Sequence, residues 1–311
     1  TYLGGNTEVQ YLKGYYVPEK PKTFDHNWQA DSLDDLKDTN IGMSVRDEAN
    51  ENEMHRKGEE ERLAQIEKEK AEIHEKNKTL FAQAVEAAKD ADAVIFVGGL
   101  NHDIDSEGFD RSDMVLPYEQ DMLIDALLSV RKDLIITLIG GSPVEMPWKD
   151  KASAILWSYY AGMETGNAFA KIIFGDINPS GKLAETFPQK YQDCVTAKNG
   201  QFGVWGKIKL EEGLYIGYRH FDRQHIAPAF CFGHGLSYTE FCYSGLTLKT
   251  EKGRDVKLSF TVKNTGKKIG SEIAQVYVAP IASKVDRPDK ELKAFAKIEL
   301  APGKSRKVDL I

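Results

Sequence analysis

The 311-residue chain lacks several features that would place a protein in a large class at once. No window approaches the roughly 18 consecutive apolar residues that a membrane-spanning helix requires, so we expect no membrane span. The N-terminus also lacks a basic stretch followed by an apolar one, the pattern of a secretory signal. The sequence begins with Thr1 rather than Met, however, and we expect processing or trimming there, so the missing leader says nothing about export.

Cysteine is scarce, with Cys194, Cys231 and Cys242 as the three copies. An odd count without Cys-x-x-Cys spacing indicates neither a disulfide framework nor a zinc site. The phosphate-binding patterns Gly-x-Gly-x-x-Gly and Gly-x-x-x-x-Gly-Lys-Ser/Thr are missing, which argues against a nucleotide. The net charge of -7 is spread along the chain without a basic cluster, which argues against nucleic acid and anionic lipid as partners. We therefore expect no metal and no cofactor.

The apolar runs that are present predict an α/β fold with a mostly parallel sheet. Residues 93–97, 134–139 and 154–157 are strand-like and alternate with helical patterns such as 118–130. Residues 57–76 are rich in Glu and Lys, with sparse apolar residues at near-heptad spacing, which predicts a long amphipathic helix running to about residue 90. We interpret it as a solvated helix laid across the sheet rather than as a lid or partner helix.

Two N-terminal stretches are less regular. Residues 8–18 mix aromatic and β-branched residues and are compatible with a strand of the sheet, whereas residues 24–53 are polar and aperiodic and are interpreted as a loop or insertion.

The hydrophobic period changes to two after about residue 238. Apolar residues alternate over 256–262, Asn264-Thr-Gly266 predicts a turn, and 273–278 supplies another strand, as in an antiparallel β-sandwich. We expect the sandwich to stop at Ile311 before a seventh strand and so to be incomplete. The predicted organisation is an α/β domain over residues 1–190 with a charged helical insertion at about 20–90, a linker region over 191–239, and the sandwich over 240–311.

Acidic residues crowd the segment that follows the first predicted strand, which reads Asp105-Ser-Glu-Gly-Phe-Asp-Arg-Ser-Asp113. Ligands of open α/β sheets bind beyond the carboxyl ends of the strands, so these carboxylates stand where a substrate would lie. Acidic loops also cap helices and solvate turns, and the loop taken alone leaves both interpretations open.

A resemblance to one family emerges from many motifs in order. The sequence carries Gly98-Gly-Leu-Asn101, Ser106-Glu-Gly-Phe-Asp-Arg111, Ser142-Pro-Val-Glu-Met-Pro-Trp148, Gly162-Met-Glu-Thr-Gly166, Phe174-Gly-Asp-Ile-Asn-Pro-Ser-Gly-Lys-Leu183, Thr186-Phe-Pro188, Glu212-Gly-Leu-Tyr-Ile-Gly-Tyr-Arg219 and Phe232-Gly-His-Gly-Leu-Ser-Tyr-Thr239. Together they resemble the second domain of glycoside hydrolase family 3, the β-glucosidase and β-xylosidase family. The sandwich resembles the fibronectin type III-like domain that follows it in many members. The resemblance covers about residues 91–311.

The resemblance implies retaining hydrolysis of a terminal β-linked sugar by two carboxyl groups on different domains. Such groups stand roughly 5 Å apart, one protonating the leaving oxygen while the other attacks the anomeric carbon. By the family's Glu-Gly-x-Asp-Arg pattern, Glu107 is the general acid/base, with Asp105 and Asp103 as fallback candidates. Asp110 and Arg111 are assigned mainly to an ion pair that fixes the loop.

The family's nucleophile resides on a (β/α)8 barrel that precedes this domain, and no Asp in the sequence matches its motif. The resemblance therefore implies two partners, a β-linked oligosaccharide and a barrel domain or chain, and we expect the chain alone to be catalytically incomplete. A homo-oligomer is left open, and a periplasmic or extracellular location is expected from the family's role in processing external polysaccharide. The alternative is a non-catalytic carbohydrate-binding or assembly module that keeps the fold.

No sugar-binding residue can be assigned from the sequence. Trp148 and Trp157 lie in apolar contexts and are interpreted as core residues rather than as platforms for a pyranose ring. Glu212, Tyr215 and Arg219 are interpreted as contacts between domains. His102 is the histidine nearest to Glu107 in the sequence, and we expect it to be exposed to solvent.

Overall fold

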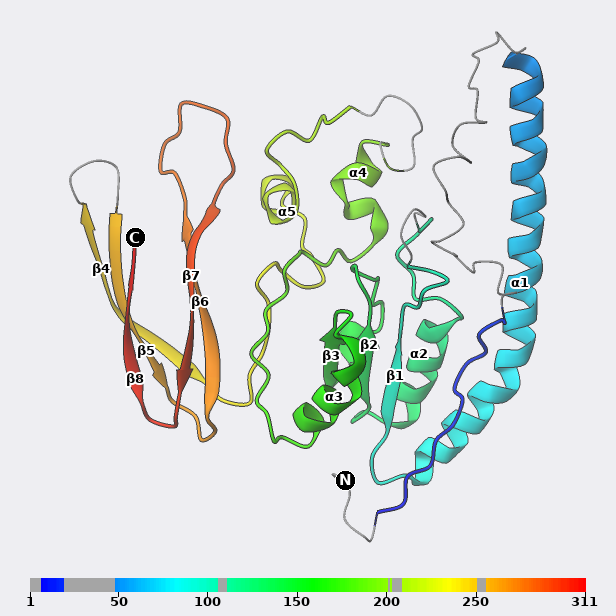
Figure 1. The fold of residues 1–311 in the computed structure, drawn as a ribbon, viewed down its shortest axis with the longest axis horizontal. Coiled ribbons are helices and arrows are strands. Elements are labelled where there is room, and N and C mark those ends of the chain that lie inside the picture. Colours follow the sequence, from blue (N-terminus) through cyan, green and yellow to red (C-terminus); the bar gives the residue numbers. More distant parts are fainter. Residues whose placement is uncertain (1–6, 20–47, 106–110, 201, 203–208, 251–255) are drawn as a thin grey trace, which may run out of the picture. The chain divides into compact units, whose positions relative to one another are not determined.

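The computed structural model describes residues 7–19, 48–105, 111–200, 202, 209–250 and 256–311, with the backbone alone for 48–63. The chain divides into two compact units (Figure 1). The helical unit comprises residues 10–94 and 118–131, and the sheet unit comprises residues 1–9, 95–117 and 132–311.

The helical unit is built from α1 (Glu48–Asp90) and α2 (Gln120–Val130). The predicted end of the long helix near residue 90 is confirmed, but α1 begins at Glu48, inside the stretch expected to be a loop. Its exposed side carries the ion pairs Lys76–Glu72, Lys78–Glu75 and Lys89–Glu86, whereas Ile73 and Ala88 are buried. This is the narrow apolar stripe of a solvated helix. In the described part of the chain, no helix combines the length and apolarity needed to cross a membrane.

Residues 7–19 contain no strand, contrary to the expectation for 8–18. One backbone group there is bound by the buried side chain of Asn77 on α1: the Tyr16 amide donates to Asn77 Oδ1 at 2.7 Å. Asn77 Nδ2 donates to the Tyr118 carbonyl at 3.0 Å and to Glu119 Oε2 at 3.1 Å. Tyr118 and Glu119 both have left-handed φ values, 61° and 60°, a conformation that costs about 1–3 kcal/mol for each such residue. The Asn77 amide therefore helps to hold a strained turn in place.

The sheet unit opens with a parallel sheet of order β1-β2-β3, formed by β1 (Ile95–Gly99), β2 (Ile135–Ile139) and β3 (Ala154–Ser158). The predicted α/β class and its three parallel strands are confirmed. Central β2 is the most buried strand, with Ile136, Thr137 and Leu138 fully inaccessible. The Thr137 hydroxyl donates to the Phe96 carbonyl at 2.7 Å, which satisfies a polar group that burial would otherwise penalise.

Short helical segments follow the sheet. They are η1 (Lys149–Lys151), η2 (Gly162–Glu164), α3 (Thr165–Ile173), η3 (Tyr191–Asp193), α4 (Val195–Lys198) and α5 (Tyr218–Gln224). The chain leaves α3 at Gly175, whose φ of 79° is the left-handed conformation common after helix ends.

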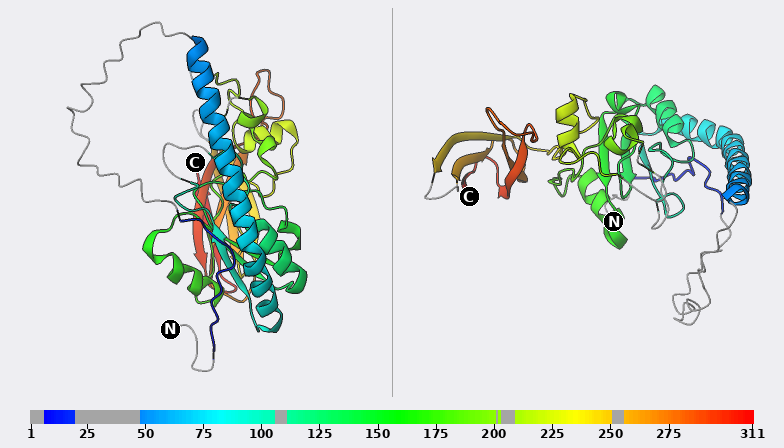
Figure 2. Two further views of the ribbon diagram at one scale, coloured as in Figure 1. Left: turned by 90° about the vertical axis from the view of Figure 1, so that its right-hand side faces the viewer. Right: turned by 90° about the horizontal axis from the view of Figure 1, so that it is seen from above.

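An antiparallel β-sandwich completes the sheet unit, as predicted. Its strands are β4 (Phe241–Thr250), β5 (Val256–Asn264), β6 (Gly270–Val278), β7 (Glu291–Leu300) and β8 (Ser305–Leu310). They form two layers, β4-β5-β8 and β6-β7, seen from above in the right-hand view of Figure 2. The core between the layers contains Phe260, Val262, Ala274, Ile298, Leu300 and Val308.

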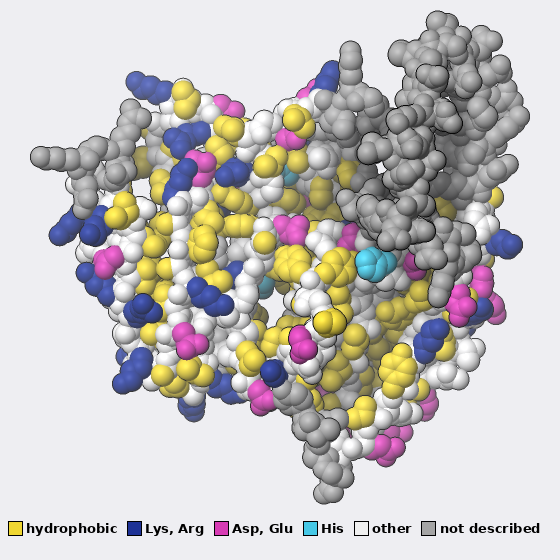
Figure 3. Space-filling model, in the orientation of Figure 1, with side chains coloured by type: hydrophobic (Ala, Val, Ile, Leu, Met, Phe, Trp, Pro, Cys, Tyr) yellow, Lys and Arg dark blue, Asp and Glu magenta, His cyan; other side chains and the backbone are white. Residues whose placement is uncertain are grey.

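Strand β4 lies at an edge of its layer and exposes much of its apolar surface. Tyr243, Leu246 and Leu248 are 48%, 64% and 63% exposed, and Figure 3 shows hydrophobic side chains among Lys and Arg over the sandwich. Exposed edge strands offer unpaired backbone groups, and interspersed charges are one way that proteins limit unwanted strand pairing there.

The turn after β5 is organised by the fully buried amide of Asn264. Its Oδ1 accepts from the Thr239 hydroxyl at 2.8 Å and from the Gly266 amide at 3.0 Å, while Nδ2 donates to the carbonyls of Lys268 and Leu300. The amide thus uses both of its donors and both lone pairs inside the protein. This is the predicted Asn264-Thr-Gly266 turn.

Replacing Asn264 by Ala should lower the free energy of unfolding of the sandwich by about 2–4 kcal/mol, because it leaves several buried groups without partners. Denaturant unfolding followed by circular dichroism measures the loss. The exposed Asn167 serves as a matched control, and Asn167→Ala should change stability by no more than about 0.5 kcal/mol. Equal effects of the two substitutions would contradict the assigned role of the buried amide.

Candidate active site

Three loops of the sheet unit meet at the carboxyl edge of the parallel sheet. Parallel strands point the same way, so residues following β1, β2 and β3 emerge side by side. Gly99 closes β1 with a φ of 123°, and a Cβ atom there would lie 1.9 Å from the Ile139 carbonyl oxygen. The next amide, Leu100 N, donates to that same oxygen at 2.7 Å. Only glycine lets the chain pass this close over the end of β2.

The predicted acidic loop begins at Asp105, whose carboxylate is held by two hydrogen bonds. Asp105 Oδ2 accepts from the Gly141 amide at 3.0 Å and from the Tyr160 hydroxyl at 2.8 Å. Burial, and then the hydrogen bond to Asp105, raise the pKa of Tyr160 to about 12, so its hydroxyl keeps its proton at neutral pH. A Cβ at Gly141 would lie 2.8 Å from the Tyr160 ring and 2.9 Å from Asp105 Oδ2. Asp105 therefore joins the ends of all three strands.

The same loop is anchored at its other end by Arg111. Its Nη2 donates to Ser142 Oγ at 3.0 Å and to the Pro143 carbonyl at 2.8 Å. Both anchors of the loop thus bind the turn after β2, residues 141–143. A segment tied at both ends to one short turn has its end points fixed relative to the sheet.

The predicted acid/base Glu107 and its neighbour Asp110 lie in residues 106–110, outside the described residues, so the Glu107 role and the Asp110–Arg111 ion pair stay predictions. Of the fallback candidates, Asp103 is exposed, and Asp105 is engaged in the contacts above. His102 is exposed, as expected.

A cavity of about 800 Å³ adjoins both anchors. Its walls come from the residues around the acidic loop and from two later segments, 184–202 and 216–232. They are Asp105, Arg111, Asp113, Met114, Ser142, Pro143, Ala184, Glu185, Thr186, Pro188, Tyr191, Cys194, Val195, Thr196, Phe202, Ile216, Gly217, Tyr218, Arg219, His220, Phe221 and Phe232. The volume is typical of a small-molecule site.

Burial shifts the pKa of several ionisable groups in this cavity. Burial raises the pKa of the Glu185 carboxyl, an effect opposed by the Tyr159 hydroxyl and the Arg111 guanidinium. Burial also raises the pKa of the Cys194 thiol to about 11, which leaves it an unreactive thiol at neutral pH. For His220, burial lowers the pKa. Its Nε2 lies 3.1 Å from the Asp193 carbonyl, which a neutral ring can satisfy as a donor.

The two tryptophans interpreted as core residues are found inside the fold. Trp148 is fully buried, and Trp157 is partly buried with its ring edge-on to Phe187 at 5.0 Å. Neither lines the cavity described above.

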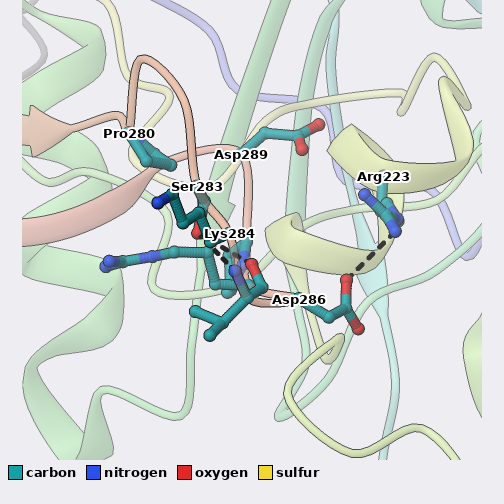
Figure 4. Close-up of a pocket in the computed structure, with 9 residues that line it drawn as sticks. Arg223, Pro280, Ser283, Lys284, Asp286 and Asp289 are labelled. Atoms are coloured by element: carbon teal, nitrogen blue, oxygen red, sulfur yellow. Dashed lines mark hydrogen bonds and ion pairs between the residues drawn. The ribbon is translucent and has the colours of Figure 1, made fainter.

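A second cavity, of about 510 Å³, lies between α5 and the loop that joins β6 to β7 (Figure 4). Arg223 pairs with Asp286 at 3.1 Å across it, and the Tyr215 hydroxyl donates to the same carboxylate. Nearby, Lys290 pairs with Asp222 at 3.1 Å. Arg223 and Asp286 in its wall are thus paired with each other, and the cavity marks a junction between α5 and the β6–β7 loop.

The predicted inter-domain role of the segment around residues 212–219 agrees with these contacts. Tyr215 reaches the β6–β7 loop, and the Arg219 guanidinium lies 4.0 Å from Glu291 of β7. Glu212 contributes its carbonyl, which accepts from the Tyr215 amide.

The sequence did not single out Tyr160 or Glu185, and it marked Thr186 only as part of the Thr186-Phe-Pro188 motif, although all three belong to the site. Tyr160 follows β3 at the same edge as the acidic loop, and that placement was available once three parallel strands had been predicted. Glu185 and Thr186 lie far along the chain, and only the fold brings them to the cavity.

Comparison with protein-family models matches residues 6–238 to the glycosyl hydrolase family 3 C-terminal domain and residues 272–310 to the fibronectin type III-like domain. Among curated proteins, the chain is 44% identical over 232 residues to thermostable β-glucosidase B of Acetivibrio thermocellus. That match covers 74% of the chain and 31% of the relative. The chain thus spans about a third of that relative's length.

Solved structures agree. A β-glucosidase of Kluyveromyces marxianus in complex with glucose matches with a TM-score of 0.72 and 37% identity, over 75% of this chain and 28% of the other. A family 3 β-glucosidase of Bifidobacterium adolescentis matches with a TM-score of 0.71 and 38% identity, over 75% of this chain and 35% of the other.

Substituting Asp105 by Ala should speed hydrogen exchange at the Gly141 amide by about tenfold to a hundredfold, because the amide loses a charged acceptor. Amide exchange measured by NMR on the 311-residue chain tests this. Asp113→Ala is the control, since Asp113 Oδ1 accepts from the Val115 amide at 3.1 Å. It should speed exchange at Val115 and leave Gly141 unchanged. Unaltered protection of Gly141 in Asp105→Ala would show that the anchor does not operate.

Proposed function

Since this chain belongs to glycosyl hydrolase family 3 and matches the C-terminal domain of that family, we propose that it supplies the general acid/base of a retaining β-glucosidase. Glu107 is the acid/base. The nucleophilic carboxylate comes from the preceding barrel part of the complete enzyme, and the substrate is a terminal β-linked glucoside of a short oligosaccharide.

The double anchoring of the acidic loop is the observation that supports this proposal most. Acid/base catalysis requires a carboxyl group held within hydrogen-bond reach of the leaving oxygen, about 2.6–3.2 Å. Asp105 and Arg111 bind the turn at residues 141–143 from the two ends of the segment that contains Glu107. Both end points of that segment are thereby fixed at the carboxyl edge, where α/β sheets bind ligands.

The reaction uses two carboxyl groups, one protonated and the other ionised. Glu107 donates its proton to the glycosidic oxygen as the barrel carboxylate bonds to the anomeric carbon and the leaving alcohol departs. Glu107, now ionised, then removes a proton from water, whose oxygen displaces the carboxylate and releases the sugar with retained configuration. An acid must keep its proton near neutral pH, which a like charge close by favours. Asp105 stands two positions before Glu107 in the sequence.

Glucose is the proposed sugar because the names of the similar proteins refer to it. The Acetivibrio thermocellus protein is a β-glucosidase, and the Kluyveromyces marxianus structure contains glucose. The chain's own contribution is proton transfer, whereas selection among sugars belongs mainly to the barrel part.

The test joins this chain to the part of the Acetivibrio thermocellus relative that precedes the matching region, and measures nitrophenol release from nitrophenyl β-glucoside. Glu107→Ala should lower kcat/KM by about 10²–10⁴-fold, the usual contribution of a general acid. The loss should be smaller for a dinitrophenyl glucoside, whose leaving group needs little protonation. Azide should restore turnover, because an anionic nucleophile needs no general base.

The exposed Glu299 on β7 provides the control, and Glu299→Ala should leave all rates unchanged. Full activity of Glu107→Ala would reject the acid/base role. An inactive but folded fusion that still binds glucose would favour a non-catalytic carbohydrate-binding module instead.

A further inference from the structure

The β-sandwich is basic, although the chain as a whole is acidic. Residues 240–311 contain fifteen Lys and Arg residues against nine Asp and Glu residues, whereas the whole chain contains 41 and 48. Figure 3 shows Lys and Arg side chains gathered over the sandwich. An excess of positive charge on one part of a chain is typical of a surface that binds anionic partners.

The middle strand of the β4-β5-β8 layer carries two of these lysines on its outer face. Successive side chains of a strand point to opposite faces of the sheet. In β5, Phe260 and Val262 belong to the core between the layers, so Lys257 and Lys263 point outward, and both are exposed. Lysines on edge strands can limit strand pairing, but β5 has a paired strand on each side, so that role does not account for these two lysines.

The strand register brings two further lysines to the same outer face, which we call the basic face. Lys249 of β4 stands directly opposite Lys257, and Lys307 of β8 stands opposite Thr261, which points outward like Lys257 and Lys263. Within the described residues, Lys249, Lys257 and Lys263 have no ion-pair partner. Like charges directly opposite each other destabilise a sheet, so an anion bound from outside would relieve the repulsion between Lys249 and Lys257.

Small hydroxyl side chains occupy most of the rest of the basic face. They are Ser244, Thr247, Ser259, Thr261 and Ser305. Each hydroxyl can both donate and accept hydrogen bonds. The register also places the acidic Asp309 on this face, where its carboxylate accepts from the Ser259 hydroxyl at 2.6 Å and lies 3.6 Å from Lys307 Nζ. One carboxylate among four lysines leaves the basic face with a positive excess.

We propose that the basic face binds an acidic polysaccharide. Its lysines pair with carboxylate groups of the polymer, and its hydroxyl groups hydrogen-bond to the sugar hydroxyls between those carboxylates. Lys257 and Lys263 are six positions apart on β5, about 20 Å at 3.3 Å per residue, a span that suits an extended polymer rather than a single sugar. The choice of a polysaccharide among polyanions rests on the proposed function, since this contact would hold a glycosidase at a carbohydrate surface.

The test compares polygalacturonate with its fully methyl-esterified form, which keeps the sugar chain and lacks the charge. We expect the 311-residue chain to bind polygalacturonate at least about tenfold more tightly at low salt, as measured by isothermal titration calorimetry. The preference should largely disappear at about 1 M salt, which screens exposed charges.

The decisive variant combines Lys249→Gln with Lys257→Gln and should weaken polygalacturonate binding about threefold to thirtyfold, the loss of two exposed ion pairs. Its thermal midpoint should stay the same or rise, because the substitutions also remove a like-charge contact between strands. The matched control combines Lys284→Gln with Lys297→Gln, an equal change of charge at exposed positions outside the basic face. The control should leave binding unchanged.

Equal binding of the two polymers would overturn the inference, as would equal weakening by the two pairs of substitutions. Tighter binding to phosphatidylglycerol vesicles or to duplex DNA than to polygalacturonate would overturn the choice of a polysaccharide. The proposed function fails separately, because nitrophenyl β-glucoside is small and uncharged and its hydrolysis does not need the basic face. A chain that binds polygalacturonate, but whose barrel fusion keeps full activity in Glu107→Ala, would retain the basic face and reject the acid/base role.

Discussion

The candidate active site depends on the parallel pairing of β2 with a strand on each side. Gly99 pairs with Ile139 in one ladder, and Ile139 pairs with Ser158 in the other, so three strand ends are fixed level with one another. The turn at residues 141–143 emerges from the middle strand and is therefore within reach of Asp105 on one side and Tyr160 on the other. A shift in register would separate these groups, because each residue of displacement moves a strand by about 3.3 Å.

Much of this arrangement is predictable from the sequence because apolar periodicity and turn residues report local structure directly. The runs at 93–97 and 154–157 indicated parallel strands, although β1 and β3 are less buried than such runs suggest, and the alternation at 256–262 indicated a strand with one face in a core. Asn264-Thr-Gly266 was recognisable as a turn, although the four hydrogen bonds of the Asn264 amide were not. The ordered motifs indicated the family, which the comparisons then showed.

The same sequence patterns do not predict side-chain contacts between residues far apart in the chain. Tyr160 is 55 positions from Asp105, and nothing local distinguishes it from the adjacent Tyr159. The expectation of a strand at residues 8–18 was wrong, and the Tyr16 amide there donates instead to the Asn77 side chain, 61 positions away. Thr186 stood out only as part of a family motif, because its unsatisfied hydroxyl is a property of its surroundings. Such features require three-dimensional proximity, which one sequence does not encode in any local pattern.

The junction around Asp286 has a consequence for behaviour in salt. Arg223 pairs with Asp286, and Asp222 pairs with Lys290, in two exposed or half-exposed ion pairs between α5 and the segment leading into β7. Charges in contact with water are screened as the Debye length shrinks, from about 10 Å at 0.1 M to about 3 Å at 1 M salt. The β-sandwich core, by contrast, is apolar and gains from salting-out ions such as sulfate. Concentrated sulfate should therefore weaken these ion pairs while strengthening the core of the sandwich.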